Sequence, residues 1–307
     1  MTNFFCQPTL SLDVGGSHVT ASVVQAPHGS VLLTPPVRFE LHEDHAADRL
    51  LDAWAQVAVQ AWQHCNLQVQ GIGVGMPGPF DYQTSEARFT GKFRSLNGVQ
   101  VTEELRQRWA GTPLADLPLH YLNDAAAFTL GEAVAGFAKR DGRVLGITLG
   151  TGLGSGFVID RHVLAGGMGI AREGQIGWEP YLDATAEDYV STGRLKADYW
   201  RWGGERISPA EIARRAEQGD DAAQQVFRQF GTHLGSIVSE WVQRFSPDAV
   251  VFGGGISRAW GCFSPQLTRQ VPSKVKLYAS HLMENAALIG AAAHTQSQLD
   301  FLLLNRL

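Results

Sequence analysis

Cysteine is scarce in this chain. Its 307 residues include three, Cys6, Cys65 and Cys262, which lie far apart. No two of them have the close spacing of a zinc knuckle or a redox motif. The sequence therefore shows no disulfide framework, and reduced thiols favour a cytoplasmic protein.

Long apolar runs, positive net charge and low-complexity linkers are also missing. No segment reaches the length of a membrane span, and the N-terminal residues lack the pattern of a signal peptide. The formal net charge of -5 provides no general attraction to nucleic acid or anionic membranes. We therefore expect neither a nucleic acid nor a membrane as partner. Without a low-complexity linker, any two domains must adjoin closely.

Glycine, in contrast, is abundant, with 34 residues that cluster in turns. Residues 10–34 read as a strand, a glycine turn, a second strand, a short turn at His28-Gly29 and a third strand. Residues 144–167 repeat this order, and positions 13–17 can be laid over positions 148–152. The repetition indicates an ancient duplication.

Amphipathic helices alternate with the strand-rich segments, beginning with residues 46–65 and ending with a helix from about Asn285. Two such halves predict two α/β domains that face each other across a ligand-binding cleft. We expect a small domain from residues 1–118 with about 290–307, and a large domain from residues 119–289.

Both glycine turns are candidates for binding phosphate, because backbone N–H groups can approach phosphate oxygens where no Cβ intervenes. The first contains Gly15 and Gly16, and the second contains Gly150, Gly152 and Gly154. Either turn alone could be an ordinary hairpin turn. Asp13, at the end of an apolar strand, could contact Mg²⁺ through water, or it could simply cap the turn.

A pair of polar residues, Asn123 and Asp124, stands where a short strand runs directly into a helix. Both residue types are common helix caps, and capping is one explanation of the pair. In the other explanation, the Asp124 carboxylate accepts the proton of a sugar hydroxyl as it attacks the γ-phosphate. Asn123 would then bind neighbouring hydroxyls with its amide.

These motifs resemble the ROK family of sugar kinases and repressors, from Leu10 to about Ala292. The resemblance implies an α/β protein with the two-domain actin/hexokinase-like (ribonuclease H-like) ATPase fold and an interdomain cleft. It also implies ATP with Mg²⁺, a hexose acceptor, Asp124 as catalytic base, and a homodimer. The nucleotide residues implied are Asp13, Gly15, Gly16, Ser17, Gly150, Thr151, Gly152, Gly253, Gly254 and Gly255. The sugar residues implied are Pro77, Gly78, Asn97, Asn123, Asp124, Gln175, Trp178 and Glu187.

The departures from the family pattern lie at the sugar end. Where the family has G-E-x-G-H, this chain has Gln175 and Trp178 in place of Glu and His. Gln can still form hydrogen bonds and Trp can stack on a sugar ring, so binding with altered preference is expected. The family's cysteine cluster is absent from residues 179–191, and we expect no structural zinc.

Three local assignments have simpler alternatives. Glu187 could be only an acid at the start of a helix. The alignment that selects Asn97 could slip by two, to Ser95. Lys92 and Arg94 lie near the expected site entrance, but their loop is rich in polar residues, and we interpret both as part of a solvated face.

The main functional hypothesis is an ATP-dependent hexose kinase. A non-catalytic or regulatory sugar-binding ROK protein is the alternative, although the first glycine turn begins a dozen residues from Met1 and leaves no room for a preceding DNA-binding motif. A kinase that binds ATP but has lost its sugar is a third possibility. Neither the hexose, nor the hydroxyl, nor the choice between ATP and polyphosphate follows from the residues.

Overall fold

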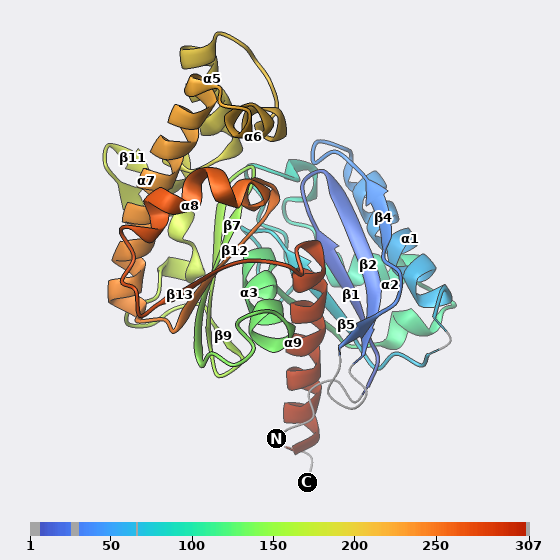
Figure 1. The fold of residues 1–307 in the computed structure, drawn as a ribbon. Coiled ribbons are helices and arrows are strands. Elements are labelled where there is room, and N and C mark those ends of the chain that lie inside the picture. The colour runs from blue at the N-terminus through green and yellow to red at the C-terminus, as the bar shows by residue number, and fades with distance from the viewer. Residues whose placement is uncertain (1–6, 26–30, 66, 305–307) are drawn as a thin grey trace. The chain divides into compact units, whose positions relative to one another are not determined.

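The computed structural model describes residues 7–25, 31–65 and 67–304. The chain forms two compact units, Met1–Ala135 with Asn285–Leu307, and Gly136–Glu284. Each unit is built on one main β-sheet (Figure 1). The expected turn at His28-Gly29 lies outside the described residues.

The first sheet combines an antiparallel meander with parallel strands. Its order is β3-β2-β1-β5-β6, and β4 also pairs with β2. β1 is antiparallel to β2 but parallel to β5, which is in turn parallel to β6. The strands are β1 (Thr9–Val14), β2 (His18–Gln25), β3 (Leu32–Leu33), β4 (Val37–Glu40), β5 (Ile72–Met76) and β6 (Leu119–Asn123).

The second sheet has the same plan. Its order is β13-β12-β7-β8-β9, so β7 and β8 correspond to β1 and β2, and β12 and β13 correspond to β5 and β6. The duplication inferred from the glycine turns thus extends to strand order and direction. The strands are β7 (Arg143–Leu149), β8 (Leu153–Ile159), β9 (His162–Leu164), β12 (Ala249–Gly253) and β13 (Lys276–Ala279), with a separate hairpin of β10 (Pro180–Tyr181) and β11 (Ala184–Thr185).

Helices connect and cover these strands. The α-helices are α1 (Ala47–Gln63), α2 (Val101–Arg108), α3 (Asp124–Ala135), α4 (Ala186–Tyr189), α5 (Thr192–Gly203), α6 (Pro209–Glu217), α7 (Asp221–Phe245), α8 (Trp260–Thr268) and α9 (Glu284–Leu304). Short 3₁₀ turns are η2 (Arg94–Leu96), η3 (Pro113–Asp116), η4 (Arg172–Gly174), η5 (Ile176–Trp178) and η6 (Gly255–Ala259). Among the described helices, none combines the length and the apolar character needed to cross a bilayer.

Alternation along β5 explains how helices cover both faces of the first sheet. Ile72, Val74 and Met76 join the apolar cluster that includes α1. Gly73 points the other way, where a side chain would overlap the Ala291 carbonyl of α9. A strand with glycine on one face thus lets α9 pack directly on the backbone.

The two helices on that face, α3 and α9, cross in backbone contact (Figure 1, green and red). A Cβ on Gly290 would overlap the Ala127 carbonyl, and a Cβ on Gly131 would overlap the Ala286 carbonyl. Small residues at the crossing therefore determine how closely α9 approaches the helix that begins at Asp124.

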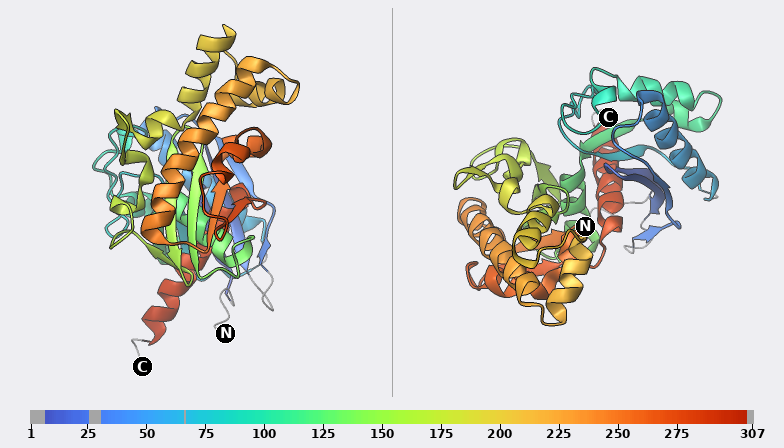
Figure 2. Two further views of the ribbon diagram at one scale, coloured as in Figure 1. Left: turned by 60° about the vertical axis from the view of Figure 1, so that its left-hand side comes forward. Right: turned by 90° about the horizontal axis from the view of Figure 1, so that it is seen from above.

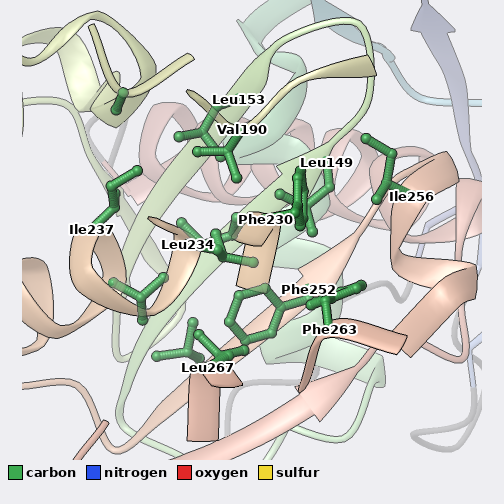
Figure 3. Packing of buried hydrophobic residues seen from close by; sticks show 14 of the residues in the cluster. Leu149, Leu153, Val190, Phe230, Leu234, Ile237, Phe252, Ile256, Phe263 and Leu267 are labelled. Carbon is green, nitrogen blue, oxygen red and sulfur yellow. The ribbon is translucent and has the colours of Figure 1, made fainter. Parts of the chain in front are cut away.

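In the second unit, α7 and α8 pack against the sheet (Figure 2). The core combines apolar residues of β7, β8 and β12 with those of the helices, and Figure 3 shows its packing around Phe252 and Phe263. Both aromatic side chains are fully buried. This core supports the two strands from which the second glycine turn projects.

The boundaries of the compact units differ from the expected domain limits of 118/119 and 289/290. β6 pairs with β5 in the first sheet, and α3 packs on α9, so residues 119–135 belong to the first unit. A division of the folded protein into a small and a large domain stays a prediction.

Candidate active site

The first glycine turn joins β1 to β2. The Gly15 N–H donates to the His18 carbonyl at 2.9 Å, which closes the turn. Asp13 is half-buried in the penultimate position of β1, and its Oδ1 is 3.6 Å from the point that a Cβ on Gly75 would occupy. The Asp13 carboxylate thus lies beside β5, at an ordinary contact distance from that point.

Two charged side chains border this turn. A Cβ on Gly16 would collide with the Glu43 carboxylate and would lie 3.6 Å from the Lys92 Cδ. Glycine at this position lets the Glu43 carboxylate come close to the turn. Neither charged residue was among the predicted site residues, because the turn sequence carries no information about which distant loops reach it.

Asn123 and Asp124 have different roles at the start of α3. The Asn123 Oδ1 accepts from the N–H groups of Ala125 and Ala126, at 3.0 and 3.1 Å. Asn123 is therefore the helix cap. Asp124 Oδ1 accepts from the Ala125 N–H at 2.8 Å, but the helix does not depend on it for capping.

The environment of Asp124 favours the protonated form of its carboxyl more than water does. Burial raises the pKa of its carboxyl above the ordinary value, because the charged form is poorly solvated. The Ala125 N–H hydrogen bond and the positive charge of Lys92 act in the opposite direction, yet the pKa stays raised. A carboxylate of raised pKa is a better base than an exposed one.

Tyr82 connects the Pro-Gly-Pro segment to Asn123. Its hydroxyl donates to the Met76 carbonyl at 3.1 Å and accepts from Asn123 Nδ2 at 3.3 Å. Pro77 and Gly78 follow β5 and lie in the sequence between Met76 and Tyr82. The Gly78–Pro79 peptide is cis. Tyr82 was not predicted, although it follows the Pro-Gly-Pro motif closely enough to have been a candidate.

The loop that carries Asn97 places other residues near the site. Asn97 is exposed at the end of η2, and Ser95, its alternative, donates to the His45 carbonyl at 2.7 Å. Lys92 lies beside the first glycine turn, and its charge acts on Asp124. Lys92 is half-buried and Arg94 is exposed, so the interpretation as a solvated face describes Arg94 better than Lys92.

The second glycine turn joins β7 to β8 and is braced by its neighbours in the second unit. The Leu153 N–H donates to Glu187 Oε2 at 2.9 Å, and the Thr192 N–H donates to the Gly150 carbonyl at 2.8 Å. A Cβ on Gly152 would overlap the Glu187 carboxylate. Glu187 is thus more than an acid at a helix start, because it ties α4 to this turn.

The Gly253–Gly255 turn packs against the end of β7, where the second glycine turn begins. Gly254 has a φ of 82°, and a side chain there would overlap the Leu149 backbone. Ser257 holds the turn, since its hydroxyl donates to the Gly254 carbonyl at 2.7 Å. Only glycine suits this conformation and this close approach.

Gln175 and Trp178 are held beside β8. The Ser155 hydroxyl donates to the Gly174 carbonyl at 2.5 Å and accepts from the Ile176 N–H at 2.8 Å. Gln175 is half-buried between these anchored residues, whereas Trp178 is half exposed. The second unit therefore brings Gln175, Glu187 and both of its glycine turns to one end of β7 and β8.

Side-chain contacts hold the hairpin that precedes Glu187. The Tyr181 hydroxyl lies 3.1 Å from His233 Nδ1, and Arg194 stacks over Tyr189 at 4.9 Å. Thr185 and Asp188 form a capping box at the start of α4.

Within residues 7–25, 31–65 and 67–304, no three His, Cys, Asp or Glu side chains gather as metal ligands would. The expected lack of a structural zinc stays a prediction.

Two sheets of one strand order, each with a glycine turn between its first two strands, define an α/β protein of the actin/hexokinase-like fold class, as the sequence predicted. Comparison with known families narrows this class. The model of the ROK family matches residues 9–298, and the chain belongs to the ROK family.

Relatives of known name include two kinds of sugar kinase. The chain is 30% identical over 252 residues to a glucokinase of Thermotoga maritima, covering 72% of this chain and 78% of that one. It is 28% identical over 269 residues to an N-acetyl-D-glucosamine kinase of Pectobacterium carotovorum, covering 80% and 83%. A ROK family glucokinase structure from Streptomyces griseus, in complex with glucose and AMPPNP, has a TM-score of 0.76 at 24% identity and covers 93% and 98%.

Proposed function

We propose that the chain is a sugar kinase that transfers the γ-phosphoryl group of ATP to a hydroxyl of a hexose, with Asp124 as general base. The main support is that the two adjacent polar residues at the start of α3 have different roles. Asn123 caps the helix, so the half-buried Asp124 carboxylate is not needed as the cap and can act as the base. The relatives named as kinases of glucose and N-acetylglucosamine support the reaction class.

In the proposed step, Asp124 accepts the proton of the attacking sugar hydroxyl. The sugar oxygen forms a bond to the γ-phosphorus as the bond from that phosphorus to the bridging oxygen of ADP breaks, and ADP leaves with the electron pair. Asn123 and Tyr82 would orient the acceptor, since both lie in the hydrogen-bonded chain next to the base. The further acceptor contacts proposed from the family resemblance are Pro77, Gly78, Asn97, Gln175, Trp178 and Glu187.

The nucleotide contacts proposed are the three glycine turns, 15–17, 150–152 and 253–255, whose backbone a phosphate can approach closely. The N–H groups of Gly15 and Gly150 already donate within their own turns, so the donors to phosphate would be neighbouring N–H groups. Asp13 is the residue that would hold Mg²⁺ through water. A half-buried carboxylate beside a phosphate turn suits this ion, which keeps several waters and takes other ligands from phosphate. When bound, Mg²⁺ would neutralise phosphate charge. A homodimer is proposed from the family resemblance alone.

A coupled assay of ADP release tests the function and the acceptor together. Wild-type protein with ATP and Mg²⁺ should turn over at least one of glucose, mannose, fructose, N-acetylglucosamine, N-acetylmannosamine and allose. Nucleotide binding without turnover of any acceptor would contradict the kinase and favour a non-catalytic ATP- or sugar-binding protein. Replacing ATP with polyphosphate in the same assay identifies the donor.

The raised pKa of Asp124 predicts the acid side of the pH profile. The base must be ionised, so kcat/KM should fall about tenfold for each pH unit below this pKa. Because burial raises the pKa, that fall should begin above pH 3.8, the ordinary value for Asp. AMPPNP affinity measured across the same pH range separates titration of the nucleotide from titration of the base. An acid limb centred at or below the ordinary value would contradict the assignment.

A further inference from the structure

The proposed mechanism gives no role to Lys92, a residue of the first unit. Its Cδ is 3.6 Å from the point that a Cβ on Gly16 would occupy, so its aliphatic stem lies over the first glycine turn. Its charge also acts on Asp124. The side chain is half-buried. The Lys92 side chain therefore lies beside the proposed phosphate turn, and its charge is felt by the proposed base.

The loop around Lys92 is firmly anchored. Phe93 is fully buried, with its ring centroid 5.6 Å from that of Trp54 and 5.4 Å from that of Phe89. Arg94 Nε donates to the Gly91 carbonyl at 3.1 Å, which closes the loop. Phe93 also has a φ of 52°, an unfavourable conformation for a non-glycine residue. Core packing thus fixes the backbone on which Lys92 stands.

In the part of the chain that the structure describes, Lys92 has the Glu43 carboxylate near the same turn and its charge acts on Asp124, but it forms no direct ion pair with either. Across residues 7–25, 31–65 and 67–304, its side chain enters neither a salt bridge nor a hydrogen bond. Partly buried lysines usually pair with a carboxylate, because an ammonium that loses water needs compensation. A half-buried lysine on an anchored backbone is suited to a ligand that brings its own negative charge.

We propose that Lys92 binds an anionic oxygen group, phosphoryl or carboxylate, placed between the first glycine turn and Asp124. This inference rests on the proposed function. Two sources could provide the anion: the phosphoryl group in transfer, or an acid group on the acceptor sugar. In either case Lys92 donates a hydrogen bond and keeps its own proton, while the acceptor proton goes to Asp124.

Kinetics of Lys92→Gln and Lys92→Arg variants test the proposal. If the anion is the transferring phosphoryl group, Lys92→Gln should lower kcat about tenfold to a hundredfold for every acceptor, with little change in the acceptor KM. Lys92→Arg should recover part of this loss, since it keeps the charge. Lys139 is an exposed lysine of the second unit. The control variant Lys139→Gln should leave kcat and KM unchanged.

If the anion belongs to the acceptor, the pattern is different. Wild-type protein should then use a hexuronate, an aldonate or a hexose phosphate more efficiently than the neutral hexoses. Lys92→Gln should raise the KM for the acidic acceptor about tenfold to a hundredfold and leave neutral acceptors unaffected. Comparing neutral with acidic acceptors therefore identifies the source of the anion.

Binding measurements keep this proposal separate from the kinase assignment. If the wild-type protein phosphorylates none of these acceptors, the proposed function fails, but calorimetric titration with AMPPNP and Mg²⁺, and with the acidic sugars, still tests Lys92. At least one of these affinities should fall about tenfold or more in Lys92→Gln. In a protein without turnover, unchanged affinities for all of these ligands would overturn the proposal. In an active enzyme, unchanged kcat and KM would overturn it.

Discussion

An Asp124→Asn variant should lose sugar phosphorylation by a factor of about 10²–10⁴, the usual contribution of a general base. Asparagine has nearly the same shape as aspartate, but its amide cannot accept the hydroxyl proton. Affinity for AMPPNP should stay near the wild-type value, because the proposed nucleotide contacts come from other residues. The measurements are steady-state kcat and calorimetric titration of the nucleotide.

Loss of folding would not explain that result. Asn123 caps α3, so the substitution leaves the cap in place. The folded-state pKa of Asp124 is raised, which means that its ionised form costs stability once the pH exceeds the ordinary value. At neutral pH the neutral amide should therefore keep the melting temperature or increase it.

Asp221→Asn is a matched control for this substitution. Asp221 is also an acid at the first position of a helix, α7, and it likewise follows a capping residue, Asp220, whose side chain accepts from the Ala223 N–H at 2.7 Å. It is exposed and lies in no proposed contact. Full activity is expected for Asp221→Asn, and full activity in Asp124→Asn would refute the assigned base.

A Gly290→Ala variant should be clearly less stable than the wild-type protein. The added methyl would overlap the Ala127 carbonyl of α3, and a backbone atom cannot rotate away as a side chain can. Helices α3 and α9 would have to separate. We expect the free energy of unfolding to fall by about 1–3 kcal/mol, as in other overpacked cores, measured by chemical denaturation.

A second helical glycine distinguishes crowding from the effect of helix propensity. Gly261 lies exposed in α8, and a Cβ there would meet no atom within 4 Å. Gly261→Ala should stabilise the protein by about 0.5–1 kcal/mol, because alanine is the better helix former. If Gly290→Ala and Gly261→Ala increased the stability equally, close packing would not explain why position 290 is a glycine.

Much of the fold could be predicted from local patterns. The two glycine turns, each between apolar strands, predicted the duplicated sheet, since a turn without side chains and the strands beside it are specified within about 15 residues. The actin/hexokinase-like class was confirmed. The expected boundary near Leu119 did not match the compact units, because the pairing of β6 with β5 joins segments that are far apart in the sequence.

Much less of the candidate site followed from spacing. Lys92 looked like one charge in a polar loop, and the loop's position depends on the burial of Phe93 against Trp54, which the loop sequence does not reveal. Asn97 was selected through a local alignment, and it is exposed. Tyr82 contacts Asn123, and Glu43 lies beside Gly16. The residues next to Tyr82 and Glu43 in the sequence do not predict these long-range contacts.

By itself, the sequence determined the order of the motifs, the places where the backbone must be glycine, and the strand that ends at Asn123. Only the tertiary structure decided which of the two adjacent polar residues caps α3, which carboxylate braces the second glycine turn, and where Lys92 stands. The reason is physical. Turns and strand periodicity arise from interactions between near neighbours, whereas burial, charge and hydrogen bonding at Asp124 arise from side chains that meet only when the core has packed.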